Sequence, residues 1–310
     1  MEAFLSIFSA DFFYAAVRMA APIILAAVGE VILERAGIFN LGIEGCMLMG
    51  AFTGVLGAYW TSSALGGLLI AICFGILIGL VFGWATISLR ANQAVTGTGL
   101  NILFLGLTSL LGRMIWGVQE VPTTVSSFEA LPLPLLSKIP VLGHILFDHT
   151  PLVYLAYLMV PAAAFVLYRT TWGLKIRAIG EYPKAADTMG IHVIRWKYAA
   201  AVFACVCAAV SGVILSLCFT NLFTDNISAG RGYMSVACVI LGQWNPFGAL
   251  AGGLIFGAGN ALQMRLQAYG VPIPTDLLLV IPMTLALVMV LLIRGKASAR
   301  PAALAKPYEK

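Results

Sequence analysis

Long, continuously apolar stretches alternate with short polar breaks along this chain. About 20 residues of helix are needed to cross roughly 30 Å of hydrocarbon. The stretches lack the alternation of a membrane barrel strand, and a helix satisfies its own backbone groups in lipid. The pattern predicts about eight full transmembrane helices of this length, over residues 12–33, 41–60, 65–89, 99–116, 151–168, 198–219, 247–266 and 276–293.

One further apolar stretch, Tyr233–Trp244, is too short to be a full span and ends at Asn245-Pro246. Broken half-spans are tolerated where they line a cavity or are buried in protein. We therefore predict a short broken or re-entrant half-helix beside a transport pathway. The predicted fold class is an all-α polytopic membrane protein with a single transmembrane domain over residues 1–310.

Glycines recur four residues apart on several predicted spans, for example at Gly75, Gly79 and Gly83. Small residues at this spacing lie on one helix face and allow the backbones of membrane helices to approach closely. The pattern favours tight packing within the chain, with a subunit interface as the alternative.

The charge distribution predicts an orientation. Only 10% of residues are charged and 61% are hydrophobic, whereas soluble domains carry about 25% charge. Of the 18 Lys and Arg, six lie in the loop 169–197 and five in the tail 294–310, so the positive-inside rule places both in the cytoplasm. Residues 118–150 hold four Pro, two Glu and one Asp but one Lys, and are predicted to be extracytoplasmic, as is the N-terminus.

Composition also excludes several functions. The positive-inside rule explains where the basic residues lie, so the net charge of +5 does not indicate nucleic-acid binding. The six Cys lie in or beside apolar stretches without zinc-ligand spacing to His, so no metal site is predicted. No catalytic triad and no Walker A sequence are present, so we expect neither enzymatic activity nor a cofactor bound by this chain.

Polar side chains interrupt or flank the apolar stretches, and a charge at the bilayer centre costs about 2.5–3.5 kcal/mol. Glu34 is predicted to lie at the membrane interface, where a charge costs little. The other polar positions either line a substrate path or cap helix ends. Uncharged amides beside an aromatic ring suit a polar neutral ligand. The candidate path residues are Asn40, Glu44, Asn92, Gln93, Asn101, Trp244 and Asn245.

The run Gly180–Ile191 is the longest polar interruption on the basic side of the chain. Pro183 suits the first turn of a helix, and Ala185 and Ala186 favour helix and present a flat surface. Gly190 suits a left-handed residue after the helix end. The sequence therefore predicts a short cytoplasmic helix that is presented to a partner.

Four blocks of sequence resemble a known family. They are residues 34–45 (ERAGIFNLGIEG), 90–97 (RANQAVTG), 180–191 (GEYPKAADTMGI) and 244–249 (WNPFGA). In this order they resemble ABC importer permeases of the branched-chain amino acid/simple sugar (ribose-type) superfamily. The residues of the first block are most similar to those of the nucleoside/simple sugar branch.

This resemblance implies a mechanism and partners. The run Gly180–Ile191 is implied to be a coupling helix that rests in a cleft of the ATPase subunit, which binds ATP and Mg. Other implied partners are a second, non-identical permease and an extracytoplasmic binding protein, in a bacterial plasma membrane. Nucleosides or purines are the implied cargo, moved by alternating access. The residues implied to contact the ATPase are Glu181, Lys184, Ala185, Ala186, Asp187 and Gly190.

Two alternatives remain open from the sequence. The same importer class carries simple sugars or branched-chain amino acids in other branches. A stand-alone secondary transporter also accounts for a broken half-helix and intramembrane amides, because such carriers place binding sites at discontinuous helices.

Overall fold

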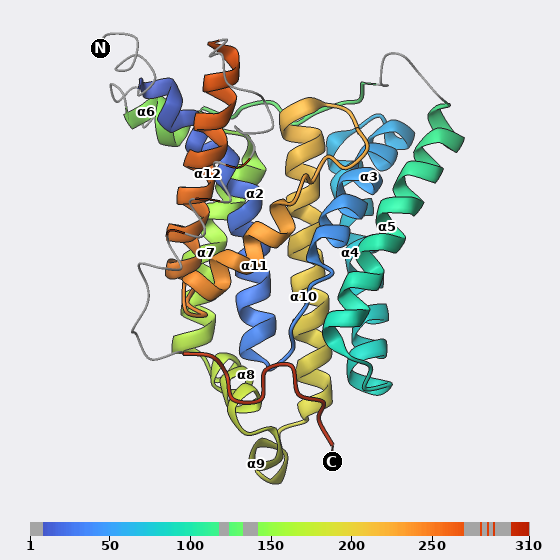
Figure 1. Cartoon of the computed structure of the whole chain (residues 1–310), viewed down its shortest axis with the longest axis vertical. Helices are drawn as coiled ribbons and strands as arrows, with labels where there is room; N and C mark the ends of the chain where they lie inside the picture. Colours follow the sequence, from blue (N-terminus) through green and yellow to red (C-terminus); the bar gives the residue numbers. More distant parts are fainter. Residues whose placement is uncertain are drawn as a thin grey trace.

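The computed structural model describes residues 9–117, 124–132, 142–269 and 299–309, with the single positions 280, 284 and 288. Within these residues all regular structure is helical, and the long helices stand side by side in one elongated bundle (Figure 1). The elements are α2 (Ala10–Arg35), α3 (Ile43–Thr61), α4 (Ala64–Gly83), η2 (Trp84–Ser88), α5 (Gln93–Trp116), α6 (Leu142–Phe147), α7 (Pro151–Arg169), α8 (Thr171–Glu181), α9 (Pro183–Thr188), α10 (Val193–Val213), η3 (Ile214–Thr220), α11 (Arg231–Leu241) and α12 (Pro246–Ala268).

Six helical segments in the described residues are long and apolar enough to cross a membrane. They are Ala10–Arg35, Ala64–Ser88, Gln93–Trp116, Pro151–Arg169, Val193–Thr220 and Pro246–Ala268. The predicted second span forms the 19-residue helix α3, and the predicted span 276–293 lies outside the described residues. The all-helical fold class is therefore confirmed, while the count of eight spans stays a prediction.

Two predicted polar breaks are partly helical in the structure. The break before the fourth span was placed at residues 90–98, but α5 begins at Gln93 because the Asn92 side chain caps it. Likewise, the loop 169–197 contains α8, α9 and the first turn of α10. Polar residues in a capped first turn of a helix look like a loop when only hydropathy is considered.

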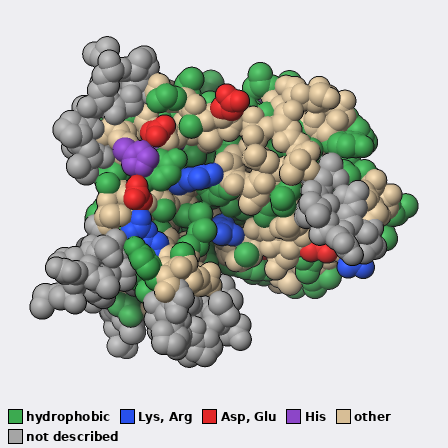
Figure 2. Space-filling view, turned by 90° about the horizontal axis from the view of Figure 1, so that it is seen from above, with side chains coloured by type: hydrophobic (Ala, Val, Ile, Leu, Met, Phe, Trp, Pro, Cys, Tyr) green, Lys and Arg blue, Asp and Glu red, His purple; other side chains and the backbone are tan. Residues whose placement is uncertain are grey.

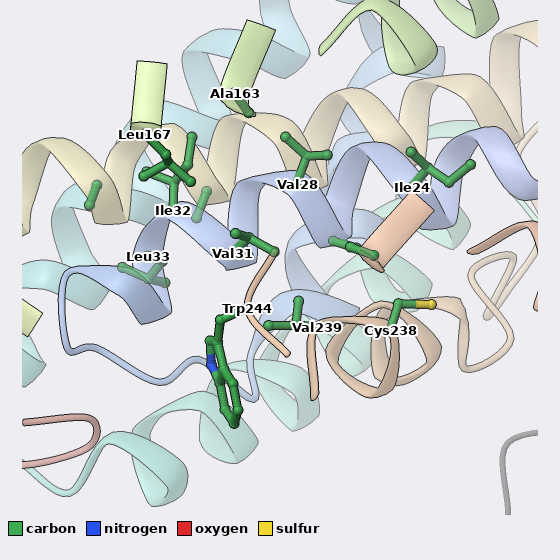
Figure 3. Close-up of a cluster of buried hydrophobic side chains, with 14 of the residues drawn as sticks. Ile24, Val28, Val31, Ile32, Leu33, Ala163, Leu167, Cys238, Val239 and Trp244 are labelled. Carbon is green, nitrogen blue, oxygen red and sulfur yellow. The ribbon is translucent and has the colours of Figure 1, made fainter. Parts of the chain in front are cut away.

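Helix α2 forms the centre of the bundle and packs against α12, α10, α11 and α7. Over its most apolar stretch α2 is 83% buried, against 17% for α5, which packs against α3 at an edge of the bundle (Figure 1). Figure 3 shows Ile24, Val28 and Ile32 of α2 meeting Leu167 of α7 and Val239 of α11 in one cluster. The exposed sides of α4 and α5 are consequently available to lipid or to another subunit.

Glycines set the closest helix contacts, as their spacing predicts. A Cβ at Gly50 or Gly212 would collide with backbone atoms across the α3–α10 contact. On α4, Gly79 lies against the backbone of Val202 in α10, where a Cβ on the glycine would be 2.6 Å from the Val202 Cα atom. These contacts are the close backbone approach that small residues allow between membrane helices.

The two ends of the bundle carry different segments (Figure 1). We call the end with α8, α9 and residues 299–309 the basic end, and the end with residues 124–132 and α6 the loop end. Thus the predicted cytoplasmic and extracytoplasmic loops lie at opposite ends. The assignment of the basic end to the cytoplasm rests on the positive-inside rule and stays a prediction.

Between η3 and α12 the chain crosses the bundle, and only about half of this crossing is helical. Near the loop end, the Asn221 carbonyl accepts a hydrogen bond from Val125 N at 2.9 Å. Near the basic end, the Trp244 carbonyl accepts one from Arg35 Nε at 2.9 Å. Between them lie an irregular segment and then α11, so a short apolar helix is confirmed here, and its role as a re-entrant half-span stays a prediction.

We predict that Gly212→Ala destabilises the chain, whereas Gly106→Ala does not. A methyl group at Gly212 meets the Met47 carbonyl, but one at Gly106 has no atom within 4 Å. Overpacking of this kind costs about 1–3 kcal/mol. The melting temperature of the purified chain in detergent measures the effect, and equal values for the two variants would contradict the packing described here.

Candidate functional site

The carboxylate of Glu44 holds the start of α11 inside the bundle. It accepts hydrogen bonds from Gly230 N at 2.7 Å and from Gly232 N at 2.6 Å, and Glu44 is only 8% exposed. The first N–H groups of a helix have no partner within it, and a negative charge there is favoured by the helix dipole. Glu44 therefore caps a helix end that water cannot satisfy.

Asn101 of α5 joins the same two regions. Its Oδ1 accepts a hydrogen bond from Gly45 N at 2.7 Å. Its Nδ2 donates to the Leu41 carbonyl at 2.7 Å and to the Tyr233 hydroxyl at 2.8 Å. One amide thus ties the beginning of α3 and the first turn of α11 to α5.

The break between α2 and α3 is held by two more predicted residues. Asn40 Oδ1 accepts from Gly42 N at 2.7 Å, and the Asn40 backbone N–H donates to Glu30 Oε1 at 3.0 Å. Gln93 Oε1 accepts from Phe39 N at 2.8 Å. These side chains satisfy backbone groups that the helices leave unpaired.

Asn92 and Asn245 are helix caps at the basic end. Asn92 Oδ1 accepts from Ala94 N at 3.0 Å and from Val95 N at 3.1 Å. Asn245 Oδ1 accepts from Phe247 N at 3.0 Å. Capping accounts for both side chains, with Asn92 rather than Thr96 or Thr98 as the cap of α5, and their contact with a substrate stays a prediction.

Trp244 closes the end of the α11 crossing against α2. Its indole N–H donates to the Glu34 carboxylate, and its carbonyl accepts from the Arg35 guanidinium. The location of Glu34 at the membrane interface stays a prediction, and the structure adds that this side chain is fully buried against protein. Tertiary contact with Trp244 explains the burial, and the hydropathy pattern gives no signal for it.

A cavity of about 690 Å³ opens at the basic end beside this pair. It brings together three of the seven predicted path residues, Asn92, Gln93 and Trp244. Asn245 lines a neighbouring cavity of about 440 Å³. Sequence reasoning missed the other side chains that line the larger cavity, namely Glu34, Phe39, Arg90, Ala91, Ala94, Ile240, Arg300, Leu304, Ala305 and Pro307.

The predicted short helix in the basic loop is present as α9 at the tip of the basic end (Figure 1), and its coupling role stays a prediction. Pro183 occupies its first turn, and Gly190 follows it with a φ of +80°, as expected for a left-handed residue after a helix. Met189 is 82% exposed and Tyr182 72% exposed. The helix thus presents apolar side chains outward.

One of the predicted contact residues faces inward instead. Ala186 is only 5% exposed and packs with Ile179 and Val193. Ala185 is the exposed member of the alanine pair, together with Lys184. A helix of six residues has one face against the protein, and Ala186 belongs to that face.

The chain's final segment is attached to the coupling region. Ala303 N donates to the Gly180 carbonyl at 2.8 Å, and Ala302 N donates to the Glu181 carboxylate at 3.3 Å. The Glu309 carboxylate lies 3.5 Å from the Arg90 guanidinium. Residues 299–309 therefore connect α8 with the rim of the larger cavity.

At the loop end, the ring of Tyr14 stacks between His144 and His149, with centroid distances of 4.6 Å to each. Burial lowers the pKa of His149. His144 also lies 3.5 Å from the Asp11 carboxylate. Figure 2 shows the histidine and acidic side chains gathered on one side of this end, where they join α2 to the segment before α7.

Comparison with known proteins identifies similar chains. Residues 13–293 match the family described as branched-chain amino acid transport system / permease component. The guanosine ABC transporter permease protein NupQ of Bacillus subtilis is 36% identical and is covered, like this chain, over 94% of its length. The nucleoside ABC transporter permease protein NupC of Lactococcus lactis is 36% identical over 90% of each chain.

Other relatives differ in their assigned substrate or are more distant. TsgC13 of Haloferax volcanii, provisionally assigned as a glucose ABC transporter permease, is 38% identical over 84% of this chain and 79% of its own. The same two bacteria hold second similar permeases, NupB of L. lactis at 22% identity and NupP of B. subtilis at 23%.

We predict that Glu44→Ala strongly destabilises the chain and that Glu44→Gln does so less. The alanine variant leaves two buried N–H groups unpaired, each costing about 1–3 kcal/mol, whereas glutamine keeps one acceptor oxygen. Asn92→Ala is the control, because loss of an exposed cap costs about 1 kcal/mol. Melting temperatures in detergent give the order, and a Glu44→Ala variant as stable as the parent would contradict the capping role.

Proposed function

The chain belongs to the branched-chain amino acid transport system permease family, and on that premise we propose that it is a permease subunit of an ATP-driven importer for nucleosides. The observation that carries the substrate is the pair of relatives named for guanosine and nucleosides, each 36% identical over at least 90% of both chains. Import, rather than export, follows from the same relationship.

Helix α9 is the part of the chain that docks on the ATPase. The residues that flank it, Tyr182 and Met189, are highly exposed, and apolar side chains on a protruding surface favour a protein partner. The proposed contact residues are Glu181, Lys184, Ala185, Asp187 and Gly190, while Ala186 supports the helix from inside. ATP and Mg belong to the partner ATPase.

Movement of α9 has a short physical route to the cavity. Gly180 of α8 lies so close to the Arg35 carbonyl that a side chain would not fit, and the Arg35 guanidinium holds the Trp244 carbonyl. A displacement of α8 is thus transmitted to the inner end of α11. Alternating access is the proposed outcome, with the Trp244 end of the crossing as a moving part.

The remaining partners are a second permease and an extracytoplasmic binding protein. Two bacteria each hold a pair of similar permeases at different levels of identity, which supports a non-identical second permease. The exposed faces of α4 and α5 provide surface for it. We place the complex in a bacterial plasma membrane.

Simple sugars are the second candidate substrate, because the relative assigned to glucose is 38% identical. Branched-chain amino acids are a third, given the family description. Calorimetry with the cognate binding protein separates the three classes. Binding of a nucleoside, with no binding of glucose or leucine, is the expected result, and the reverse would move the assignment to another class.

We predict that cells lacking this chain lose uptake of radiolabelled guanosine and that the restored gene recovers it. Excess unlabelled adenosine or inosine is added to compete with guanosine uptake, and unlabelled glucose is added as the control. Competition by glucose alone would contradict the nucleoside assignment.

We predict that Met189→Glu reduces ATPase co-purification and nucleoside uptake several-fold without changing the stability of the chain. A charge replaces an exposed apolar contact, and Met189 touches little within its own chain. Lys306→Glu is the control, because Lys306 is exposed at the same end but outside α9. Full ATPase recovery and uptake with Met189→Glu would argue against docking through this face.

A further inference from the structure

The larger cavity at the basic end has the size and the lining of a small-molecule site. Its volume of about 690 Å³ falls within the roughly 300–1,000 Å³ of ligand pockets. The lining combines aromatic Phe39 and Trp244 with amides at Asn92 and Gln93. Such sites are mostly apolar with a few placed polar groups.

Glu34 determines which kind of hydrogen-bonding group a ligand in this cavity must carry. The side chain is fully buried and lines the cavity. One carboxylate oxygen accepts from the Trp244 indole, while Oε1 has no hydrogen-bond partner among the described residues. A buried oxygen without a partner is costly, and a carboxyl oxygen accepts hydrogen bonds, so the matching ligand offers an N–H or O–H donor here.

Basic side chains complete the pattern. Arg90 and Arg300 line the same cavity as Glu34. Guanidinium groups donate to adjacent ring and keto acceptors, as in the pairing of Arg with guanine O6 and N7. A carboxylate beside guanidinium groups therefore suits a planar heterocycle with donors on one edge and acceptors on another.

We propose that this cavity binds the base of a purine nucleoside of the guanine type, with Glu34 accepting its N–H groups and Trp244 or Phe39 packing on its ring. This proposal rests on the proposed function, because the ligand is the transported nucleoside at the inner mouth of the path. Adenine has an amino group but no keto oxygen, so it binds more weakly. A metal cation is disfavoured by the two arginines.

The C-terminal segment forms one wall of this site. Leu304 is 5% exposed and lines the cavity with Ala305 and Pro307. The same segment is bonded to Gly180 and Glu181 of α8. The wall of the site is thus attached to the region that carries the coupling helix. A movement that the ATPase imposes on that helix is therefore transmitted to the wall beside the bound base.

A protection experiment on the complete transporter complex tests the site. Ala91 is exposed and lines the cavity, so Ala91→Cys reports on access to a charged maleimide. Ala302→Cys is the control, because Ala302 is exposed on the C-terminal segment but does not line the cavity. Of the native cysteines, Cys73 alone is exposed, and the parent complex measures its background.

Guanosine is expected to slow the labelling of Ala91→Cys several-fold, adenosine less, and glucose not at all, with Ala302→Cys unchanged. Adding Glu34→Gln to Ala91→Cys is expected to abolish the preference for guanosine over adenosine. Glutamine can still accept from the Trp244 indole, so the fold is retained, and the melting temperature checks it. If this variant does not fold, the ligand series with Ala91→Cys alone decides.

The outcomes separate this site from the proposed function. A complex that transports guanosine but shows no guanosine protection at Ala91→Cys overturns the site and leaves the function standing. Protection by guanosine in a complex that transports only glucose supports the site and overturns the function. Equal protection by all three ligands, or protection that persists unchanged in Glu34→Gln, overturns the assignment to a guanine-type base.

Discussion

A helix that starts inside a membrane bundle needs a hydrogen-bond acceptor at its first N–H groups, and Glu44 supplies it for α11. Both carboxylate oxygens are used, on Gly230 N and Gly232 N. Asn101 adds a second tie through Tyr233. The half-length crossing, and the position of Trp244 at its far end, depend on this capping interaction.

The residues that the proposed transport mechanism uses lie together at the basic end. Trp244 joins α11 to α2 through Glu34 and Arg35. Helix α8 touches the end of α2 at Gly180, and the C-terminal segment is bonded to the same residue. Helix α9 (the proposed docking helix), the inner end of the crossing and the wall of the cavity therefore belong to one connected set of contacts. Rigid elements in contact are a physical route for coupling two sites.

The sequence predicted the fold class well, because hydropathy marks spans and glycine spacing marks close helix contacts. A short apolar stretch located the half-helix, and the positions of Pro183 and Gly190 located α9. It could not choose between path and cap for Asn40 or Asn101, since both roles use the same side chain and differ only in tertiary partners. It gave no signal that the side chains of Glu34 and Ala186 are buried. Burial at a helix end depends on segments distant in sequence.

We propose that this permease moves nucleosides with energy from a partner ATPase. The most direct measurement is guanosine accumulation in proteoliposomes that hold the complete complex and its binding protein, with either ATP or an ion gradient as the energy source. Accumulation above the external concentration with ATP, and none with a sodium or proton gradient, is the predicted result. Gradient-driven accumulation by this chain alone, without ATP, would contradict the claim.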